Sequence, residues 1–410
     1  MAAQHPVLAG RRVIELGTML AAPFAGHLLA QLGAEVIKVE PPAGDPTRTT
    51  TRGGAGGSFL AYNRGKQSVC IDLKTSEGQA VLMRLIASAD VVLHNLSPAS
   101  TRALGVTRAD CLRVNPGVVY CHIQGYGSGP LENELASNPV IEASTGVMFG
   151  HRINGRPTRL GPSYHDQFAG SYAVIGILAA LQAPVDDVDA RCVELGLYET
   201  GLHVAARDYA GDQLKAQLGV VARAGADPGE FSAPGYGAYE TADGRWVYLL
   251  MLSDGHWKKF CDALVPAETH DETLTTSRSR KKRRPEVELI VKTAVAALPL
   301  AELSSRLRDA GVGFTEIKPS DQVLNEAQAQ VPGKLARLGY AQHQFDLPNL
   351  PLPHQRAPLE GELPPPLLGE HTMAVLASIG YQEPECAVLQ AAGVVAVLTQ
   401  VGTGWAPPRA

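Results

Sequence analysis

The stretch LAGRRVIELGTMLAAPFAGHLLAQLGAEVIKVEPPAGD, residues 8–45, contains the repeating unit that decides the fold. A short β-branched run, VIEL at 13–16, is followed by an apolar helical segment at 23–33 and by a second run, EVIKVE, at 35–40. Two strands joined by a helix of this length pair in parallel, with the helix crossing over one face of the sheet. We therefore expect a mostly parallel sheet that starts near the N-terminus.

The same alternation continues to about Ile123. Further strand-like runs occupy 66–73, 90–95 and 117–125, and a helical pattern occupies 76–89. Regular alternation of strands and amphipathic helices is typical of an α/β domain. The helix ends agree with this interpretation: Gly33 has the position of a C′ glycine, and Thr75 or Ser76 precedes Glu77 as in a capping box.

A change in composition divides the chain. Residues 218–235 are rich in Gly, Ala and Pro, which indicates a boundary. Beyond it the sequence predicts a hairpin turning at Asp243–Gly244 and a helix with Trp257, Phe260 and Leu264 on one face. We expect a large N-terminal part over 1–217, a small α+β domain over 218–325, and a connector with a returning segment over 326–410. The proline-dense stretch 346–371 is expected to be extended.

Composition favours a metabolic enzyme. The 410 residues are 45% hydrophobic and carry a net charge of -5, which argues against a nucleic-acid partner. The six cysteines are scattered and predict reduced thiols, with no disulfide framework and no metal site. The sequence shows no signal peptide and no membrane span, so we expect a cytoplasmic protein. The basic run RSRKKRRP at 278–285 is expected to be a solvated surface.

Three common nucleotide and hydrolase motifs are missing from the sequence. After the first strand run, only Gly17 and Gly26 are present where a dinucleotide fold has G-x-G-x-x-G. Gly65–Lys66 is followed by Gln67, so there is no P-loop, and there is no G-x-S-x-G elbow. The missing motifs argue against three functions: nicotinamide-dependent redox chemistry, ATP-driven ligation and Ser-triad hydrolysis.

One carboxylate stands out in GPSYHDQFAGSYAVIGILAALQA, residues 161–183. Asp166 lies at the mouth of a predicted helix rich in small residues, which allow another backbone to approach closely. The simplest interpretation is that Asp166 is the N-cap, since Asp is favoured there. Adjacent His165 is interpreted as a turn residue without a catalytic role.

Four segments together resemble the class III coenzyme A transferases of the CaiB/BaiF superfamily, namely residues 8–45, 63–95, 155–181 and 366–381.

This resemblance implies a Rossmann-like large domain built from both chain ends, a smaller domain between them, and an interlocked homodimer. It also places the family's catalytic aspartate on Asp166. The implied reaction moves CoA from an acyl-CoA donor to a small organic acid, through an aspartyl anhydride and an aspartyl-CoA thioester. CoA is the co-substrate, and neither a metal nor a membrane is involved.

The resemblance assigns the CoA contacts to three segments, of which the first follows the first predicted strand and the other two lie at the ends of predicted strands, and to Arg102. The expected CoA-binding residues are Leu20, Ala21, Ile71, Asp72, Leu73, Lys74, Asn95, Leu96 and Arg102. The chain also departs from the family pattern. Arg102 stands one position before the family arginine, which falls on Ala103. The family's basic or histidine position becomes 136–138, and its common glutamine becomes Glu142. Residues 222–230 replace the glycine-rich loop with only two glycines.

Two other functions stay open from the sequence alone. The α-methylacyl-CoA racemases look similar but use a His/Asp pair, and no histidine occurs here between His122 and His151. A non-catalytic CoA-binding subunit would tolerate the changes at 136–138, although it would not need Asp166. The sequence names neither the donor nor the acceptor acid.

Overall fold

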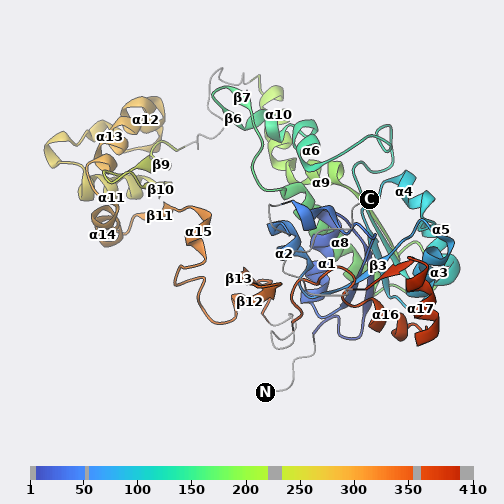
Figure 1. Cartoon of the computed structure of the whole chain (residues 1–410). Helices are drawn as coiled ribbons and strands as arrows, with labels where there is room; N and C mark the ends of the chain where they lie inside the picture. Colours follow the sequence, from blue (N-terminus) through green and yellow to red (C-terminus); the bar gives the residue numbers. More distant parts are fainter. Residues whose placement is uncertain (1–5, 51–54, 220–232, 354–361, 398–410) are drawn as a thin grey trace. The chain divides into compact units, whose positions relative to one another are not determined.

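The computed structural model describes residues 6–50, 55–219, 233–353 and 362–397, and divides into two compact units. The large unit comprises 1–149, 159–220 and 331–410, and the small unit comprises 150–158 and 221–330. Figure 1 shows the chain passing through the large unit, the small unit and the large unit again. The central sheet, which carries the candidate site, belongs to the large unit.

Seven strands form the central sheet in the order β14-β3-β2-β1-β4-β5-β8. All neighbours pair in parallel except β14, which runs antiparallel to β3. The predicted mostly parallel sheet is confirmed. The strands are β1 (Arg12–Leu16), β2 (Glu35–Glu40), β3 (Lys66–Ile71), β4 (Val91–His94), β5 (Val119–Gln124), β8 (Cys192–Gly196) and β14 (Val395–Ala396).

Helices cover both faces of this sheet (Figure 1). Two short hairpins, β6–β7 (Arg152–Ile153, Arg156–Pro157) and β12–β13 (Leu335–Tyr340, His343–Pro348), lie outside it. The helices outside residues 221–330 are α1 (Ala21–Gln31), α2 (Gly57–Asn63), α3 (Ser76–Ala87), α4 (Pro98–Ala103), α5 (Arg108–Val114), α6 (Asn138–Ser144), α7 (Val147–Gly150), α8 (Tyr164–Ala180), α9 (Leu197–Val204), α10 (Ala206–Gln217), α16 (Thr372–Ser378), α17 (Glu383–Ala391) and the 3₁₀ turn η1 (Pro46–Thr49).

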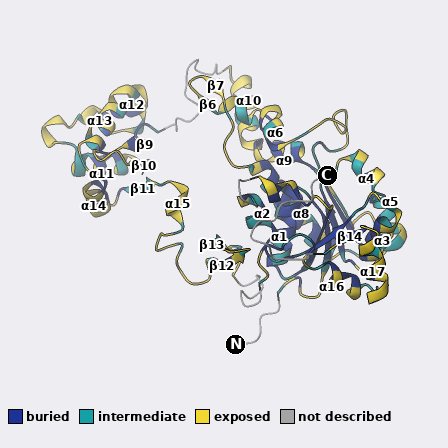
Figure 2. Ribbon diagram, in the orientation of Figure 1, coloured by how far each residue is buried: buried dark blue, intermediate teal, exposed yellow. Residues whose placement is uncertain are grey.

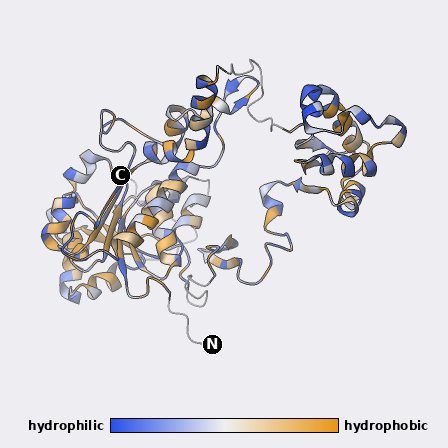
Figure 3. Cartoon of the chain, turned by 180° about the vertical axis from the view of Figure 1, so that it is seen from behind, coloured by the Kyte–Doolittle hydropathy of each residue, from blue (hydrophilic) through white to orange (hydrophobic). Residues whose placement is uncertain are grey.

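Successive strand residues pack into different cores, because side chains alternate across a strand. In β1, Val13 joins the cluster beneath α1 and α8, while Ile14 joins the cluster beneath α3, α5, α16 and α17. The strands are therefore buried on both faces, as parallel strands usually are. Figure 2 shows them as buried segments and Figure 3 as hydrophobic ones.

The C-terminal segment completes the sheet of the N-terminal segment. Backbone N–H groups of Ser68 and Cys70 on β3 donate to His371 Nδ1 at 3.2 Å and Thr372 Oγ1 at 3.1 Å. Val375 and Leu376 of α16 enter the same core as α3. The sequence motif GEHT therefore acts as a connection between the two ends of the chain.

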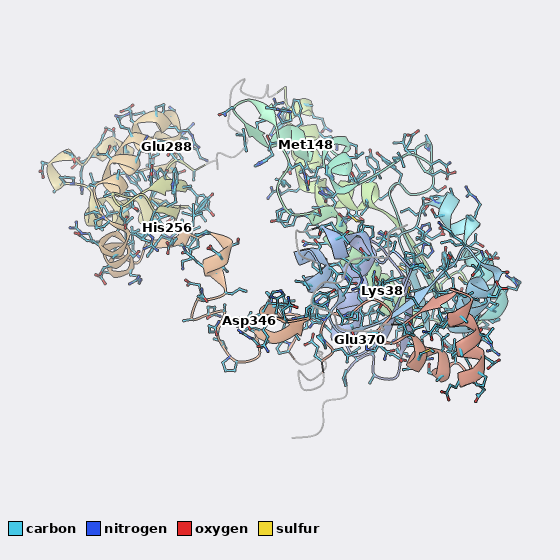
Figure 4. All side chains as sticks on the ribbon, viewed as in Figure 1. Lys38, Met148, His256, Glu288, Asp346 and Glu370 are labelled. Atoms are coloured by element: carbon cyan, nitrogen blue, oxygen red, sulfur yellow. The ribbon has the colours of Figure 1, made fainter. Side chains whose placement is uncertain are left out.

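A buried ion network holds the loop that follows β1. Lys38 Nζ lies 3.1 Å from Glu15 Oε1 and 3.0 Å from Asp45 Oδ2, and it donates to the Gly17 carbonyl at 2.6 Å. Lys66 Nζ lies 2.7 Å from Glu15 Oε2. These side chains are fully buried, so each charge depends on its partners. Figure 4 labels Lys38 in the sheet.

The small unit has a three-stranded antiparallel sheet and its own core, which includes Trp257 and Phe260. The predicted hairpin is confirmed, with Gly244 at a φ of 75° between β9 and β10. Its elements are β9 (Gly237–Glu240), β10 (Trp246–Leu250), β11 (Gly313–Ile317), α11 (Asp254–Leu264), η2 (Ala267–Thr269), η3 (Glu272–Leu274), α12 (Ser277–Lys282), α13 (Arg284–Ala296), α14 (Leu300–Ala310) and α15 (Ser320–Val323).

Two expectations need correction. The basic run is not entirely a solvated surface, because Arg280 is buried, bonds Asp254 at 2.6 Å and lies over the Trp257 ring. The stretch 346–371 is extended at its start, where residues 346–348 end β13, but it closes in a turn in which the Glu370 N–H donates to the Leu367 carbonyl at 3.2 Å; residues 354–361 lie outside the described part. Within the described residues no helix has both the length and the apolar character needed to cross a bilayer.

Candidate active site

The strand order reverses between β1 and β4, which creates a switch point at the carboxyl ends of these strands. Ligands of open α/β sheets bind at such points. Asn95, directly after β4, ties the two loops together: its Oδ1 accepts from Thr18 N–H, and its Nδ2 donates to the Thr18 carbonyl, both at 2.9 Å. Next to Thr18, Met19 has a φ of 63°, which is uncommon for a side-chain-bearing residue. We call these two bonds between Asn95 and Thr18 the Asn95 clamp. The clamp holds a loop of unusual backbone conformation.

The expected CoA-binding residues lie along one edge of this sheet. Leu20 and Ala21 lie at the start of α1 after β1, Asn95 and Leu96 follow β4, Ile71 ends β3, and 72–74 follow it. The Asn95 clamp joins the loop that leads into Leu20 and Ala21 to the segment that contains Asn95 and Leu96. Ile71 is fully buried in the core, whereas Lys74 is exposed; Arg102 is exposed at the end of α4. No contact joins Arg102 to the clamp in the described residues.

Helix α8 carries Asp166 and packs closely on α1. A Cβ added to Gly170 would lie 2.8 Å from the Ala21 carbonyl oxygen, and one added to Gly176 would lie 2.6 Å from Val193 Cγ1. Both distances are shorter than real side chains allow. The expectation that the small residues permit close approach is confirmed at these two positions. Gly170 thus seats the Asp166 helix against the start of α1.

Asp166 is not the N-cap of α8. The helix starts at Tyr164, its N-cap is Ser163, and Asp166 lies inside the first turn. The Asp166 side chain is only 9% exposed, and among the described residues it makes no hydrogen bond or ion pair. Burial raises the pKa of this carboxyl to about 6, although the charge of Arg159 acts in the opposite direction. The arrangement leaves a buried carboxylate whose oxygens are available for chemistry.

Two residues near Asp166 define its electrostatic surroundings, and one of them, His165, lies elsewhere than expected. Arg159 is exposed, and its guanidinium acts on the Asp166 carboxyl through its charge. His165 lies in the first turn of α8 rather than in a turn outside it, and its ring is 3% exposed. Neither ring nitrogen of His165 finds a hydrogen-bond partner in the described part of the chain, and burial lowers the pKa of the imidazole.

Sequence reasoning missed the contacts that fix the start of α8. Asn138 and Glu142, noted only as departures from the family pattern, are buried and bond the segment that leads into Asp166. A capping residue supplied from another helix leaves no local signal, so no pattern in 161–183 could have revealed it. The loop at 222–230 lies outside the described residues.

Comparisons with known proteins agree on one family. The sequence model described as CoA-transferase family III matches residues 8–372. The chain is 31% identical to the succinate–glutarate CoA-transferase of Agrobacterium fabrum, over 92% of this chain and 96% of that protein. It is 30% identical to the succinyl-CoA–D-citramalate CoA-transferase of Chloroflexus aurantiacus, over 94% and 97%. A crystal structure of a CaiB/BaiF family protein from Brucella suis is similar with a TM-score of 0.79 at 26% identity, over 92% of this chain and 100% of that one.

Proposed function

The chain belongs to CoA-transferase family III and is a CoA-transferase, and on this premise we propose that Asp166 is the nucleophile that carries the acyl group and then CoA. The observation that carries the proposal is the buried Asp166 carboxylate, which makes no hydrogen bond or ion pair among the described residues and is influenced only by the charge of Arg159. A carboxylate that served only as a cap or an ion-pair partner would be bonded. Its position in the first turn of α8 also places it at the positive end of the helix dipole.

The reaction proceeds in four displacements. The Asp166 carboxylate attacks the thioester carbonyl of the donor, the C–S bond breaks, and CoA leaves as a thiolate. A mixed anhydride between Asp166 and the donor acid remains. The thiolate attacks the aspartyl carbonyl and releases the donor acid, which leaves an aspartyl-CoA thioester. The acceptor carboxylate then attacks this thioester and expels the CoA thiolate, which leaves an anhydride between Asp166 and the acceptor. The thiolate attacks the acceptor carbonyl of this anhydride and expels the Asp166 carboxylate. The products are the new acyl-CoA and the free Asp166 carboxylate, so no ATP is consumed.

The residues at the carboxyl edge of the sheet are assigned to CoA. Leu20, Ala21, Asn95 and Leu96 would line its path, together with the segment 71–74. Asn95 contributes by holding Thr18, since a loop fixed before binding loses less entropy on binding. Arg102 is exposed and is assigned only a peripheral contact with the nucleotide.

Arg159 is assigned to the acceptor acid. The acceptor must bring its carboxylate next to Asp166 when Asp166 holds CoA as a neutral thioester, and a nearby guanidinium favours that approach. The two relatives described above are named for dicarboxylic acids, namely succinate with glutarate and with D-citramalate. We therefore assign succinyl-CoA as the donor and a small dicarboxylic acid as the acceptor.

A second copy of the chain would cover α8. Beyond Tyr172 this helix carries only apolar residues, AVIGILAA, yet Ile175 is 63% exposed within one chain, and Phe168 in the preceding turn is 41% exposed. Helices that are apolar on every side are normally buried. This face supports a homodimer, and interlocked subunits predict that tagged and untagged protein fail to exchange when mixed; heterodimers within minutes would contradict interlocking.

A panel of acyl-CoA donors and free acids, read by mass spectrometry of the CoA esters, tests the function. We expect new CoA esters from succinyl-CoA with small dicarboxylates such as glutarate and D-citramalate, and no dependence on ATP. Exchange of the α-proton of a branched acyl-CoA in D₂O without any new ester would indicate a racemase. CoA binding without turnover for every pair would indicate a non-catalytic subunit.

A further inference from the structure

The first turn of α8 is held by a side chain from another helix. The N-cap residue, Ser163, makes no side-chain cap bond. Instead, the backbone N–H of His165 donates to Asn138 Oδ1 on α6 at 2.9 Å, and Asn138 is 3% exposed. First-turn N–H groups have no partner within their own helix, so an acceptor placed here fixes where the helix begins. Asn138 takes the place of the local cap.

Glu142 fixes the orientation of Asn138. It lies one turn further along α6, is fully buried, and accepts from Asn138 Nδ2 at 2.5 Å through Oε1. A carboxylate only accepts hydrogen bonds, so it forces the amide nitrogen of Asn138 toward itself and the amide oxygen toward His165. The other oxygen, Oε2, accepts from the backbone N–H of Leu160 at 3.1 Å.

These bonds hold both ends of the segment 160–165. Leu160 directly follows Arg159, and His165 directly precedes Asp166. The Asp166 carboxylate itself has no partner in the described residues that would fix its position. The positions of the Asp166 carboxylate and of Arg159 therefore depend on the backbone between them. Asn138 and Glu142 hold this backbone.

We propose that Asn138 and Glu142 form a positioning pair that sets the Asp166 carboxylate for attack on the thioester. This inference rests on the proposed role of Asp166 as the nucleophile. Displacement of a reacting group by about 1 Å costs on the order of 100-fold in rate, even when the change lies away from the reacting atoms. Loss of the pair should therefore lower kcat strongly and the affinity for CoA little.

Exchanging the amide and the carboxylate between positions 138 and 142 tests the positioning pair. In Glu142→Gln, the new side-chain amide has one oxygen for two donors, Leu160 N–H and Asn138 Nδ2, so one bond is lost. In Asn138→Asp, two carboxylates face each other across the 2.5 Å contact. In the double variant the bonds return. The new carboxylate at position 138 accepts from His165 N–H and from the new amide at position 142, and the oxygen of that amide accepts from Leu160 N–H. The swap preserves shape and reverses only which partner carries the charge.

The experiment measures kcat and donor KM with succinyl-CoA and glutarate, together with hydroxylamine trapping of Asp166, on the purified full chain. We expect each single variant to lose about 100-fold in kcat with donor KM within about threefold. The double variant should recover to within about fivefold of wild type. Asn115→Asp is the matched control, because it removes side-chain bonds to the carbonyls of Ile86 and Ala89 away from α8. It should lower stability and leave kcat near the wild-type value.

The outcomes separate this inference from the function it rests on. Wild-type protein that transfers CoA without any trapped Asp166 contradicts the nucleophile and removes the premise. Trapped Asp166 in wild type, with single variants at wild-type kcat or a folded double variant that stays as slow as the singles, overturns the positioning pair. If a single variant does not fold, Asn138→Ala takes its place, because it removes the acceptor for the His165 N–H without adding a charge. The kcat of the double variant must still recover to near the wild-type value.

Discussion

Gly170 of α8 lies against the carbonyl oxygen of Ala21 at the start of α1, so closely that an added Cβ would come within 2.8 Å of it. Asp166 lies one helical turn before Gly170, and Ala21 opens the helix that follows the clamped loop. This single contact connects the proposed nucleophile to the proposed CoA edge of the sheet. The distance between the two functional parts therefore depends on the absence of a side chain at position 170.

Gly170→Ala should force α8 away from α1. The added methyl meets the Ala21 carbonyl oxygen and the Phe24 ring, and the backbone atom cannot turn aside, so we expect a loss of about 1–3 kcal/mol in unfolding free energy and a reduced kcat. Urea denaturation and steady-state kinetics measure both effects. Gly211→Ala on α10 is the matched control, since a Cβ there meets nothing within 4 Å and should stabilise the helix by up to about 1 kcal/mol. Equal behaviour of the two variants would refute the close-contact argument.

Asn95→Ala should weaken CoA binding. The change removes both bonds to Thr18 and releases the loop that leads into Leu20 and Ala21. Each lost bond is worth about 1 kcal/mol, so calorimetry should show CoA affinity lower by about 10-fold or more, with the acceptor KM nearly unchanged. Asn115→Ala, which loses two bonds of the same kind elsewhere in the large unit, should bind CoA normally. Unaltered affinity in Asn95→Ala would remove the clamp from the CoA site.

The pH dependence of kcat/KM for the donor should follow Asp166. Attack requires the ionised carboxylate, and burial raises the pKa of Asp166 to about 6. The rate constant should therefore rise with pH and level off above a midpoint near 6. Arg159→Gln removes the charge that lowers this pKa, so its midpoint should move to higher pH. A profile that is flat between pH 5 and 7.5 would contradict the assignment.

The same burial predicts that Asp166 costs stability. A carboxyl whose pKa is higher in the folded chain than in the unfolded chain binds protons more tightly when folded, so stability falls as pH rises from about 4 to about 6. Above pH 6 the cost approaches about 3 kcal/mol at 1.36 kcal/mol per pKa unit. Asp166→Asn should therefore unfold at higher urea than wild type at pH 8 and at similar urea at pH 4. A variant less stable at pH 8 would indicate a structural role for the carboxylate.

Local patterns predicted the sheet well. Gly33, with a φ of 98°, ends α1 as expected, and Thr75 caps α3 through Gly78 N–H at 3.0 Å. These features depend only on neighbouring residues and on the alternation of apolar side chains along strands. The order of the strands was not predicted, because it depends on pairing between segments distant in the sequence.

The geometry of the site could not be predicted in this way. Asp166 has the residue type of an N-cap, but Asn138, on a different helix, binds the first turn instead. Arg280 belongs to a charged run, but Asp254 and the Trp257 ring draw it into the small unit. Both outcomes depend on contacts between elements distant in sequence, which composition and periodicity do not encode.

The most direct test of the central claim is to trap the activated Asp166 carbonyl that the anhydride and the thioester have in common. Wild-type protein is incubated with succinyl-CoA alone, treated with hydroxylamine, digested, and mapped by mass spectrometry, with Asp166→Asn and a sample lacking succinyl-CoA as controls. We predict a hydroxamate on Asp166 only in wild type with succinyl-CoA, and a fall in CoA transfer by several orders of magnitude in Asp166→Asn. An unmodified Asp166 peptide together with an active Asp166→Asn variant would contradict the account.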